Sequence, residues 1–132
     1  MTLGAGNDAL VLSAPSANGN SYTTVTDIAV GDTINLAALT ATARADAALG
    51  AKVILADTAA FADYLAATTA ADAFAAALVN WFQYGGNTYI VVDDEAAASN
   101  VFDNGVDSVI KLTGLVDLTR STTATDVLTI VA

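Results

Sequence analysis

The spacing of hydrophobic and polar positions changes twice along the chain. Residues 1–39 hold short alternating runs between turn-forming residues, residues 40–80 are dense in alanine, and residues 81–132 return to β-branched and aromatic runs. Alternation is typical of strands, whereas alanine-rich segments favour helices. The pattern predicts one domain over residues 1–132 of the β-rich α+β class: mainly β with an Ala-rich helical insertion, and layered like a β-roll or β-sandwich.

The first segment predicts three short strands separated by turns. Pro15, Asn18 and Gly19 mark a loop over residues 13–21, and Gly31-Asp32 marks a tight turn. The expected strands are Leu10–Leu12, Tyr22–Ile28 and Thr33–Leu36.

The middle segment predicts helices around one buried strand. Gly50 is suited to end a helix, and Asp57-Thr58 and Thr69 are suited to begin one. Phe74, Leu78 and Phe82 are spaced four apart, as on one helix face. The expected elements are helices over 41–49 and 57–67, a strand over 52–55, and a helix from 69 along that face.

The third segment predicts a hairpin, which competes with the last of these helices for residues 79–82. Two apolar runs, 79–84 and 88–92, flank Gly85-Gly86-Asn87, a strong hairpin signal. Further strands are expected over 108–112 and 127–131. Trp81, Phe82 and Tyr84 are more typical of a core than of an exposed aromatic patch.

The charge balance and the missing residue types exclude several classes of site and partner. Four Lys and Arg stand against 14 Asp and Glu, for a formal net charge of −10, and the chain has neither Cys nor His. Disulfides, Cys/His zinc sites and imidazole or thiolate chemistry are therefore excluded. A phosphate-tracking surface needs more basic residues than four, so we expect no nucleic-acid partner. No apolar run approaches the ~18 residues of a membrane span, so we expect no membrane insertion.

The first candidate site is the turn Gly4-Ala5-Gly6-Asn7-Asp8 before the first strand. Gly4 and Gly6 allow backbone carbonyls to turn toward an ion, and Asn7 and Asp8 add side-chain oxygens. Calcium prefers such oxygen ligands. The turn predicts half of a calcium site, and the alternative is an ordinary glycine turn.

A second candidate lies at Asp27 and Asp32, which flank a short apolar run, with Asp32 in a Gly-Asp turn. Either carboxylate is a candidate calcium ligand, and a solvated β-turn is the alternative.

The third candidate is an acidic loop with Asp93-Asp94-Glu95 and then Asp103-Asn104-Gly105-Val106-Asp107. Clustered carboxylates repel one another, and a divalent cation would relieve that repulsion. The predicted metal ligands here are Asp93, Asp94, Asp103 and Asp107, and a solvated acidic turn is the alternative.

A catalytic interpretation has little support. The chain contains no phosphate-binding loop and no dinucleotide-binding fingerprint, and Asp pairs carry no signal in a chain with 13 Asp. We expect no enzyme activity.

Four stretches together resemble a known family. GAGNDALVL resembles the degenerate repeats of RTX-type proteins, and TVTDIAVGDTINLAAL resembles the stretch that follows those repeats. The third stretch, WFQYGGNTYIVVDD followed by FDNGVDSVIKLTGLVDL, is similar to C-terminal regions of secreted surface-layer proteins, including "bluetail"-type domains. Residues 126–132 resemble the acidic-then-aliphatic ending of type I secretion signals.

The resemblance implies a C-terminal domain of a longer bacterial protein, secreted or held at the cell surface. It implies a type I exporter as the partner of the C-terminal residues, Ca²⁺ bound outside the cell, and self-association or a lattice with the parent protein. Weak oxygen-ligand sites fill at extracellular calcium, so folding would follow export. The alternatives are the tail of an RTX exoenzyme or adhesin, and a metal-free structural β module.

Overall fold

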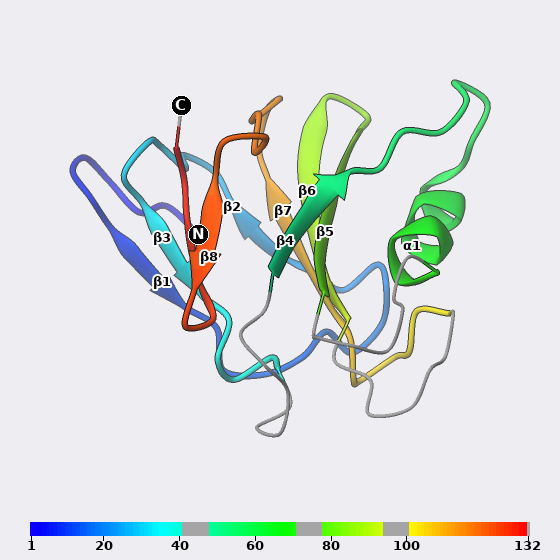
Figure 1. Cartoon of the computed structure of the whole chain (residues 1–132), viewed down its shortest axis with the longest axis horizontal. Coiled ribbons are helices and arrows are strands. Elements are labelled where there is room, and N and C mark those ends of the chain that lie inside the picture. Colours follow the sequence, from blue (N-terminus) through cyan, green and yellow to red (C-terminus); the bar gives the residue numbers. More distant parts are fainter. Residues whose placement is uncertain (41–47, 71–77, 94–100, 132) are drawn as a thin grey trace.

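The computed structural model describes residues 1–40, 48–70, 78–93 and 101–131. These residues form nine strands in two mixed sheets and one short helix, so the chain is mainly β as expected. The two sheets face each other, and the helix lies on the outer side of the larger sheet (Figure 1).

The smaller sheet has four strands in the order β1-β3-β9-β8. β1 (Ala9–Val11) runs parallel to β3 (Thr33–Asn35), and β9 (Val127–Thr129) runs antiparallel to both β3 and β8 (Thr122–Ala124). The last strand of the chain therefore lies inside this sheet and not at its edge.

The larger sheet has five strands in the order β2-β7-β6-β5-β4. β5 (Leu78–Tyr84) and β6 (Asn87–Asp93) form the predicted hairpin, and Gly85 and Gly86 both have positive φ, as a two-residue hairpin turn requires. The remaining strands are β2 (Thr23–Val25), β4 (Ala48–Lys52) and β7 (Ser108–Leu112).

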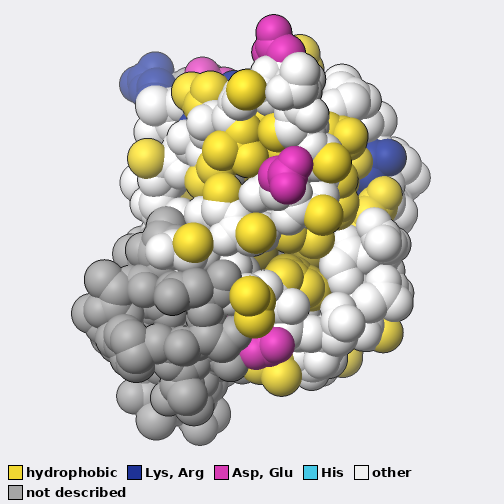
Figure 2. All heavy atoms as spheres, turned by 90° about the vertical axis from the view of Figure 1, so that its right-hand side faces the viewer, with side chains coloured by type: hydrophobic (Ala, Val, Ile, Leu, Met, Phe, Trp, Pro, Cys, Tyr) yellow, Lys and Arg dark blue, Asp and Glu magenta, His cyan; other side chains and the backbone are white. Residues whose placement is uncertain are grey.

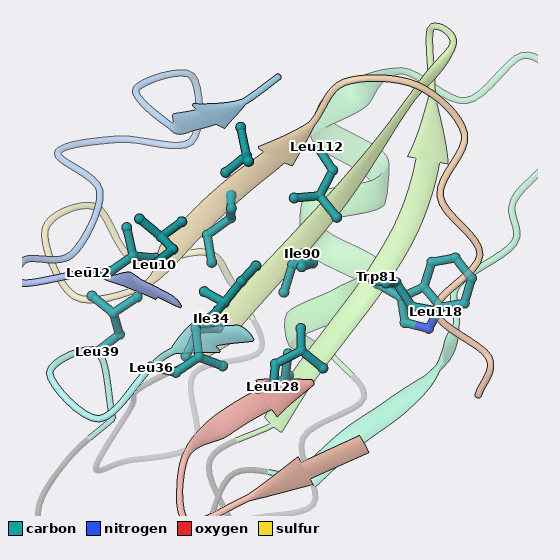
Figure 3. Close-up of a cluster of buried hydrophobic side chains, with 14 of the residues drawn as sticks. Leu10, Leu12, Ile34, Leu36, Leu39, Trp81, Ile90, Leu112, Leu118 and Leu128 are labelled. Atoms are coloured by element: carbon teal, nitrogen blue, oxygen red, sulfur yellow. The ribbon is translucent and has the colours of Figure 1, made fainter. Parts of the chain in front are cut away.

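The main core fills the space between the sheets. Ile34 and Leu128 come from the smaller sheet, Trp81 and Ile90 come from the larger one, and all four point into the same cluster (Figure 3). Alternate residues of β1, β3, β5, β6, β7 and β9 reach this core, as the two-residue period of a strand requires.

A second, aromatic cluster covers the outer face of the larger sheet. Phe82 and Tyr89 stack at 5.2 Å between ring centroids, and Phe61 of helix α1 (Phe61–Thr69) packs edge-on to Tyr89 at 4.9 Å. Burial and the neighbouring Tyr22 raise the pKa of Tyr89 to about 12. Trp81 and Phe82 are therefore both core residues, as expected, on opposite faces of the sheet, whereas Tyr84 is 36% exposed and lies outside the core.

The solvent side of this cluster is largely apolar. Ala62 and Ala66 are exposed on α1, and hydrophobic side chains gather across this side of the molecule (Figure 2). At nine residues, α1 falls well short of the length needed to cross a membrane, and no other helix occurs in the described residues.

Residues 1–12 run alongside residues 25–36, and each residue lies next to the residue 24 positions later in the sequence. β1 and β3 pair in this register, and just after the end of β2 the Met1 carbonyl accepts the N–H of Thr26 at 2.9 Å. We call residues 1–12 the first rung and residues 25–36 the second rung. Together they form one turn of a parallel coil that passes from the smaller sheet through β2 and back.

The predicted helix over 41–49 is wrong at its end, and its residues 41–47 lie outside the described residues. Residues 48–52 form β4, so the strand expected over 52–55 is wrong except for Lys52, and residues 53–55 lie beyond its end. A Cβ at Gly50 would lie 2.1 Å from Oδ1 of Asn80 on β5. Gly50 therefore allows the close approach of a neighbouring strand and does not end a helix.

The other two helix predictions also need correction. α1 begins at Phe61 and not near Asp57, because Asp63 accepts the N–H of Ala60 at 2.8 Å and so closes the first turn there. The helix expected along Phe74, Leu78 and Phe82 is wrong for its last two positions, which belong to β5. Phe74 lies outside the described residues.

The C-terminal strand is confirmed in a shorter form, and β8 was not predicted. β8 and β9 are joined at Thr125 and Asp126, both at positive φ. Such a turn usually contains glycine or asparagine, so its sequence gives a weak signal.

The buried end of the chain provides the first prediction. Replacing Leu128, which is fully buried in β9, by Ala is expected to lower the free energy of unfolding by about 2–4 kcal/mol through lost contacts and a cavity. Leu115→Ala is the matched control, because Leu115 is 68% exposed. Urea denaturation measures both, and equal losses in the two variants would contradict the assigned core.

Candidate metal sites

The carboxylate of Asp27 binds the backbone of the first rung. It accepts the N–H of Leu3 at 2.8 Å and of Gly4 at 2.9 Å, one to each oxygen. These donors, Leu3 first, hold the pKa of the Asp27 carboxyl below its usual value of 3.8. Asp27 therefore fastens the start of the first rung to the second.

Asp32 has the equivalent role further along the same second rung, in a buried position. Its carboxylate accepts the N–H of Asp8 at 2.9 Å and of Ala29 at 2.8 Å, again one to each oxygen. Both predicted ligands of this pair already serve the backbone, which favours a structural role for them.

The glycine turn before β1 has the backbone conformation that was expected of it. Gly4 and Gly6 have φ of +112° and +125°, which residues with a Cβ rarely adopt. The side chain of Asn7 lies over Gly31, where a Cβ would be 2.4 Å from Asn7 Oδ1. Asn7 therefore packs against the next rung, as Asp8 does through its N–H.

The acidic loop brings two predicted ligands together in a buried position. Val92 of β6 pairs with Ser108, the first residue of β7, and one further step of this register, beyond the start of β7, puts Asp93 opposite Asp107. We call Asp93 and Asp107 the facing pair. Asp93 is 2% exposed and Asp107 is fully buried. Because Val91 belongs to the aromatic cluster, the period of two puts the Asp93 side chain at the end of that same outer face of β6.

The loop before β7 is a compact turn closed by Asp107. Its Oδ2 accepts the N–H of Asp103 at 2.7 Å, and its own N–H donates to the Asp103 carbonyl at 2.9 Å. Ser16 joins this turn to the rest of the molecule, since its N–H donates to the Asp107 carbonyl. Asp103 is thus adjacent to the facing pair, whereas Asp94 lies outside the described residues.

The predicted ligands form two separate groups. The turn before β1 and the loop before β7 lie on opposite sides of the molecule (Figure 1). Within the described ranges, no group of three or more acidic side chains is arranged to hold a metal ion. The facing pair is the arrangement in which one cation would contact two of the predicted carboxylates.

An internal repeat was missed in the sequence and explains the first group. At the offset of 24 the two rungs share T-x-x-A-x-x-D-x-Φ-x-L, where Φ is Leu or Ile. A comparison of the chain with itself would have found this pattern. It places Asp8 and Asp32 at equivalent positions, as the structure does.

A mostly apolar pocket of about 340 Å³ was also not predicted. Arg120 and Asp117 are its only charged lining residues, and none of the predicted metal ligands lines it. The other lining residues are Ile28, Ala29, Val30, Val116, Ile130 and Val131.

No protein-family model matches the chain, and a search of curated proteins finds no significant match.

The hydrogen bonds of Asp27 predict a pH dependence. Because its pKa is lowered in the folded state, its contribution to stability is present above about pH 4 and is lost as the pH falls through the folded-state pKa. In Asp27→Asn, the free energy of unfolding should fall less steeply below pH 4 than in the unmodified chain. Urea denaturation between pH 2 and 7 measures this.

Asp57→Asn is the control, because it removes an exposed carboxylate. If the free energy of unfolding falls equally steeply with pH in Asp27→Asn and in the unmodified chain, the hydrogen bonds from Leu3 and Gly4 do not stabilise the fold.

Proposed function

We propose that this chain is the C-terminal calcium-binding and secretion domain of a bacterial protein of the surface-layer type. In this proposal a type I system exports the parent protein, and the domain folds outside the cell and supports assembly there. The observation that carries the calcium part is the facing pair Asp93 and Asp107.

The pair needs an explanation because both side chains are buried. Like charges directly opposite each other destabilise a sheet, and burial increases the cost of each charge. A divalent cation, which prefers carboxylate and carbonyl oxygens, would remove both costs at once. Oδ2 of Asp107 also accepts the N–H of Asp103, and carbonyl oxygens and water would complete the coordination of a cation held by the pair.

The position of the C-terminal strand supports the secretion part. Leu128 and Ile130 are buried in the main core, so an exporter can reach them only in the unfolded chain. A site that fills outside the cell would therefore delay folding until the C-terminal residues have been used as a signal. The chain's net charge of −10 acts in the same direction, because self-repulsion opposes compaction until ions bind.

The stacked rungs support a β-roll-like interpretation of residues 1–36. Strands in different sheets alternate along the coil, and equivalent residues lie over one another. The same features suit the tail of an RTX exoenzyme or adhesin, because they concern export and folding and not the activity of the parent. The chain itself has no proposed catalytic role.

A metal-free structural β module is the second candidate. It is favoured by the roles of Asp27 and Asp32, whose oxygens bind backbone N–H groups. The two candidates differ in their response to calcium.

Calcium should stabilise the folded chain. At a concentration of ~10 Kd the gain is about 1.4 kcal/mol, which corresponds to roughly 5 °C in Tm for a domain of this size. Calorimetry in calcium and in chelator measures it, with magnesium as the ion control. Asp93→Asn should abolish the calcium-dependent rise, whereas Asp57→Asn should retain it. A Tm that is the same in calcium and in chelator would favour the metal-free module.

Deleting residues 126–132 should block secretion. The measurement is the amount of a passenger in the medium when it is fused to the chain, with and without these residues, in cells that carry a matching type I exporter. Leu128→Ala is the control, because it destabilises the folded core and keeps the length and charge of the ending. Equal secretion with and without residues 126–132 would leave the ending as a core strand only.

A further inference from the structure

The two rungs repeat the same contacts as well as the same sequence. Thr2 and Thr26 are equivalent in the repeat, and their hydroxyls lie 3.0 Å apart, within hydrogen-bond distance. Leu10 of the first rung pairs in register with Ile34 of the second, and both are buried in the main core. The repeat is therefore a stacking unit, in which each position lies over its own counterpart.

In the side-chain contacts between the rungs that involve a carboxylate, the carboxylate comes from the second rung and the backbone N–H from the first. Asp32 of the second rung binds the N–H of Asp8 in the first rung. Asp27 likewise binds N–H groups of the first rung, at Leu3 and Gly4. Each carboxylate thus reaches toward the rung that lies before it in the stack, so a rung uses its acidic side chains to hold its predecessor.

In the first rung only Asp8 could make such a contact, because Leu3 occupies the position equivalent to Asp27. Asp8 is the counterpart of Asp32, yet one of its carboxylate oxygens is buried without a hydrogen-bond partner among the described residues. A buried acceptor without a donor costs free energy, so the first rung has a position for one more backbone N–H.

The outer edge of the first rung is short, with three residues in β1, but it lacks the side chains that normally protect an edge strand. β1 ends the smaller sheet among the described strands, and its Val11 side chain is 66% exposed. Residues 1–12 contain no Lys, Arg or Pro, which are common devices against edge pairing.

We propose that this edge binds one further rung of the same 24-residue repeat, running parallel to β1. Its N–H groups would pair with the carboxylate of Asp8 and with the outer edge of β1. The occupant is defined by the repeat pattern, because only a parallel strand in that register presents backbone N–H groups to Asp8 as the first rung presents them to Asp32. This proposal does not depend on calcium or on export.

The test places a second copy of residues 1–24 directly before residue 1 of the full chain, with all measurements in chelator. If the added copy stacks, Tm should rise by several degrees and the urea m-value should increase, because more surface is buried. A copy of the same composition in scrambled order is the control and should change neither quantity.

The variant Asp8→Ala then distinguishes an added copy that stacks on the first rung from one that only lengthens the chain. In the original chain it should leave Tm unchanged or raise it slightly, because the buried oxygen of Asp8 has no partner to lose and its burial costs free energy. In the extended chain it should lower Tm about as much as Asp32→Ala lowers it in the original chain. This comparison measures whether Asp8 has taken over the role of Asp32.

Three results would overturn the proposal. The first is a Tm and m-value that the added copy leaves unchanged, as the scrambled copy should. The second is an equal effect of Asp8→Ala in both chains. The third is dimerisation of the original chain through β1 in sedimentation, prevented by the added copy, which would assign the edge to a second copy of the chain.

Discussion

Three segments that are far apart in the sequence meet at one buried residue, Asp32. Its carboxylate binds the N–H of Asp8 from the first rung and of Ala29 from the turn before β3. Its carbonyl accepts the N–H of Ile130, and the N–H of neighbouring Gly31 donates to the Ile130 carbonyl. A charged acceptor in such a site forms stronger hydrogen bonds than a neutral one. The beginning, the crossover between the sheets and the end of the chain are thus held in one register.

The strands were predictable where the local signal agrees with the packing. The hairpin around Gly85-Gly86 and the strand over 108–112 follow from turn chemistry and from residues that favour strands. The alanine-rich middle was not predictable in the same way. Alanine favours a helix in isolation, but residues 48–52 pair with β5, and Gly50 makes room for Asn80 there. The conformation of residues 48–52 therefore depends on pairing with a distant strand, which no local sequence pattern predicts.

The candidate site was predictable in its residue types but not in its roles. A carboxylate in a Gly-Asp turn looks the same in sequence whether it binds an ion or a backbone N–H, and the structure shows N–H partners for Asp27 and Asp32. Asp93 and Asp107 are 14 residues apart in the sequence, and only the β6–β7 register brings them face to face. The 24-residue offset was visible in the sequence, yet the two copies share too few identical residues to stand out without a self-comparison.

Because the larger sheet is covered on both faces, its central strand cannot alternate between apolar and polar residues. β6 contains Tyr89-Ile90-Val91-Val92, all four of which are buried. In an unfolded chain such a run is the kind of segment that stacks with copies of itself into fibrils. The sequence continues directly with Asp93-Asp94-Glu95, and charges that flank an apolar strand oppose that stacking. The acidic stretch after β6 would therefore act as an aggregation gatekeeper in any unfolded form of this chain.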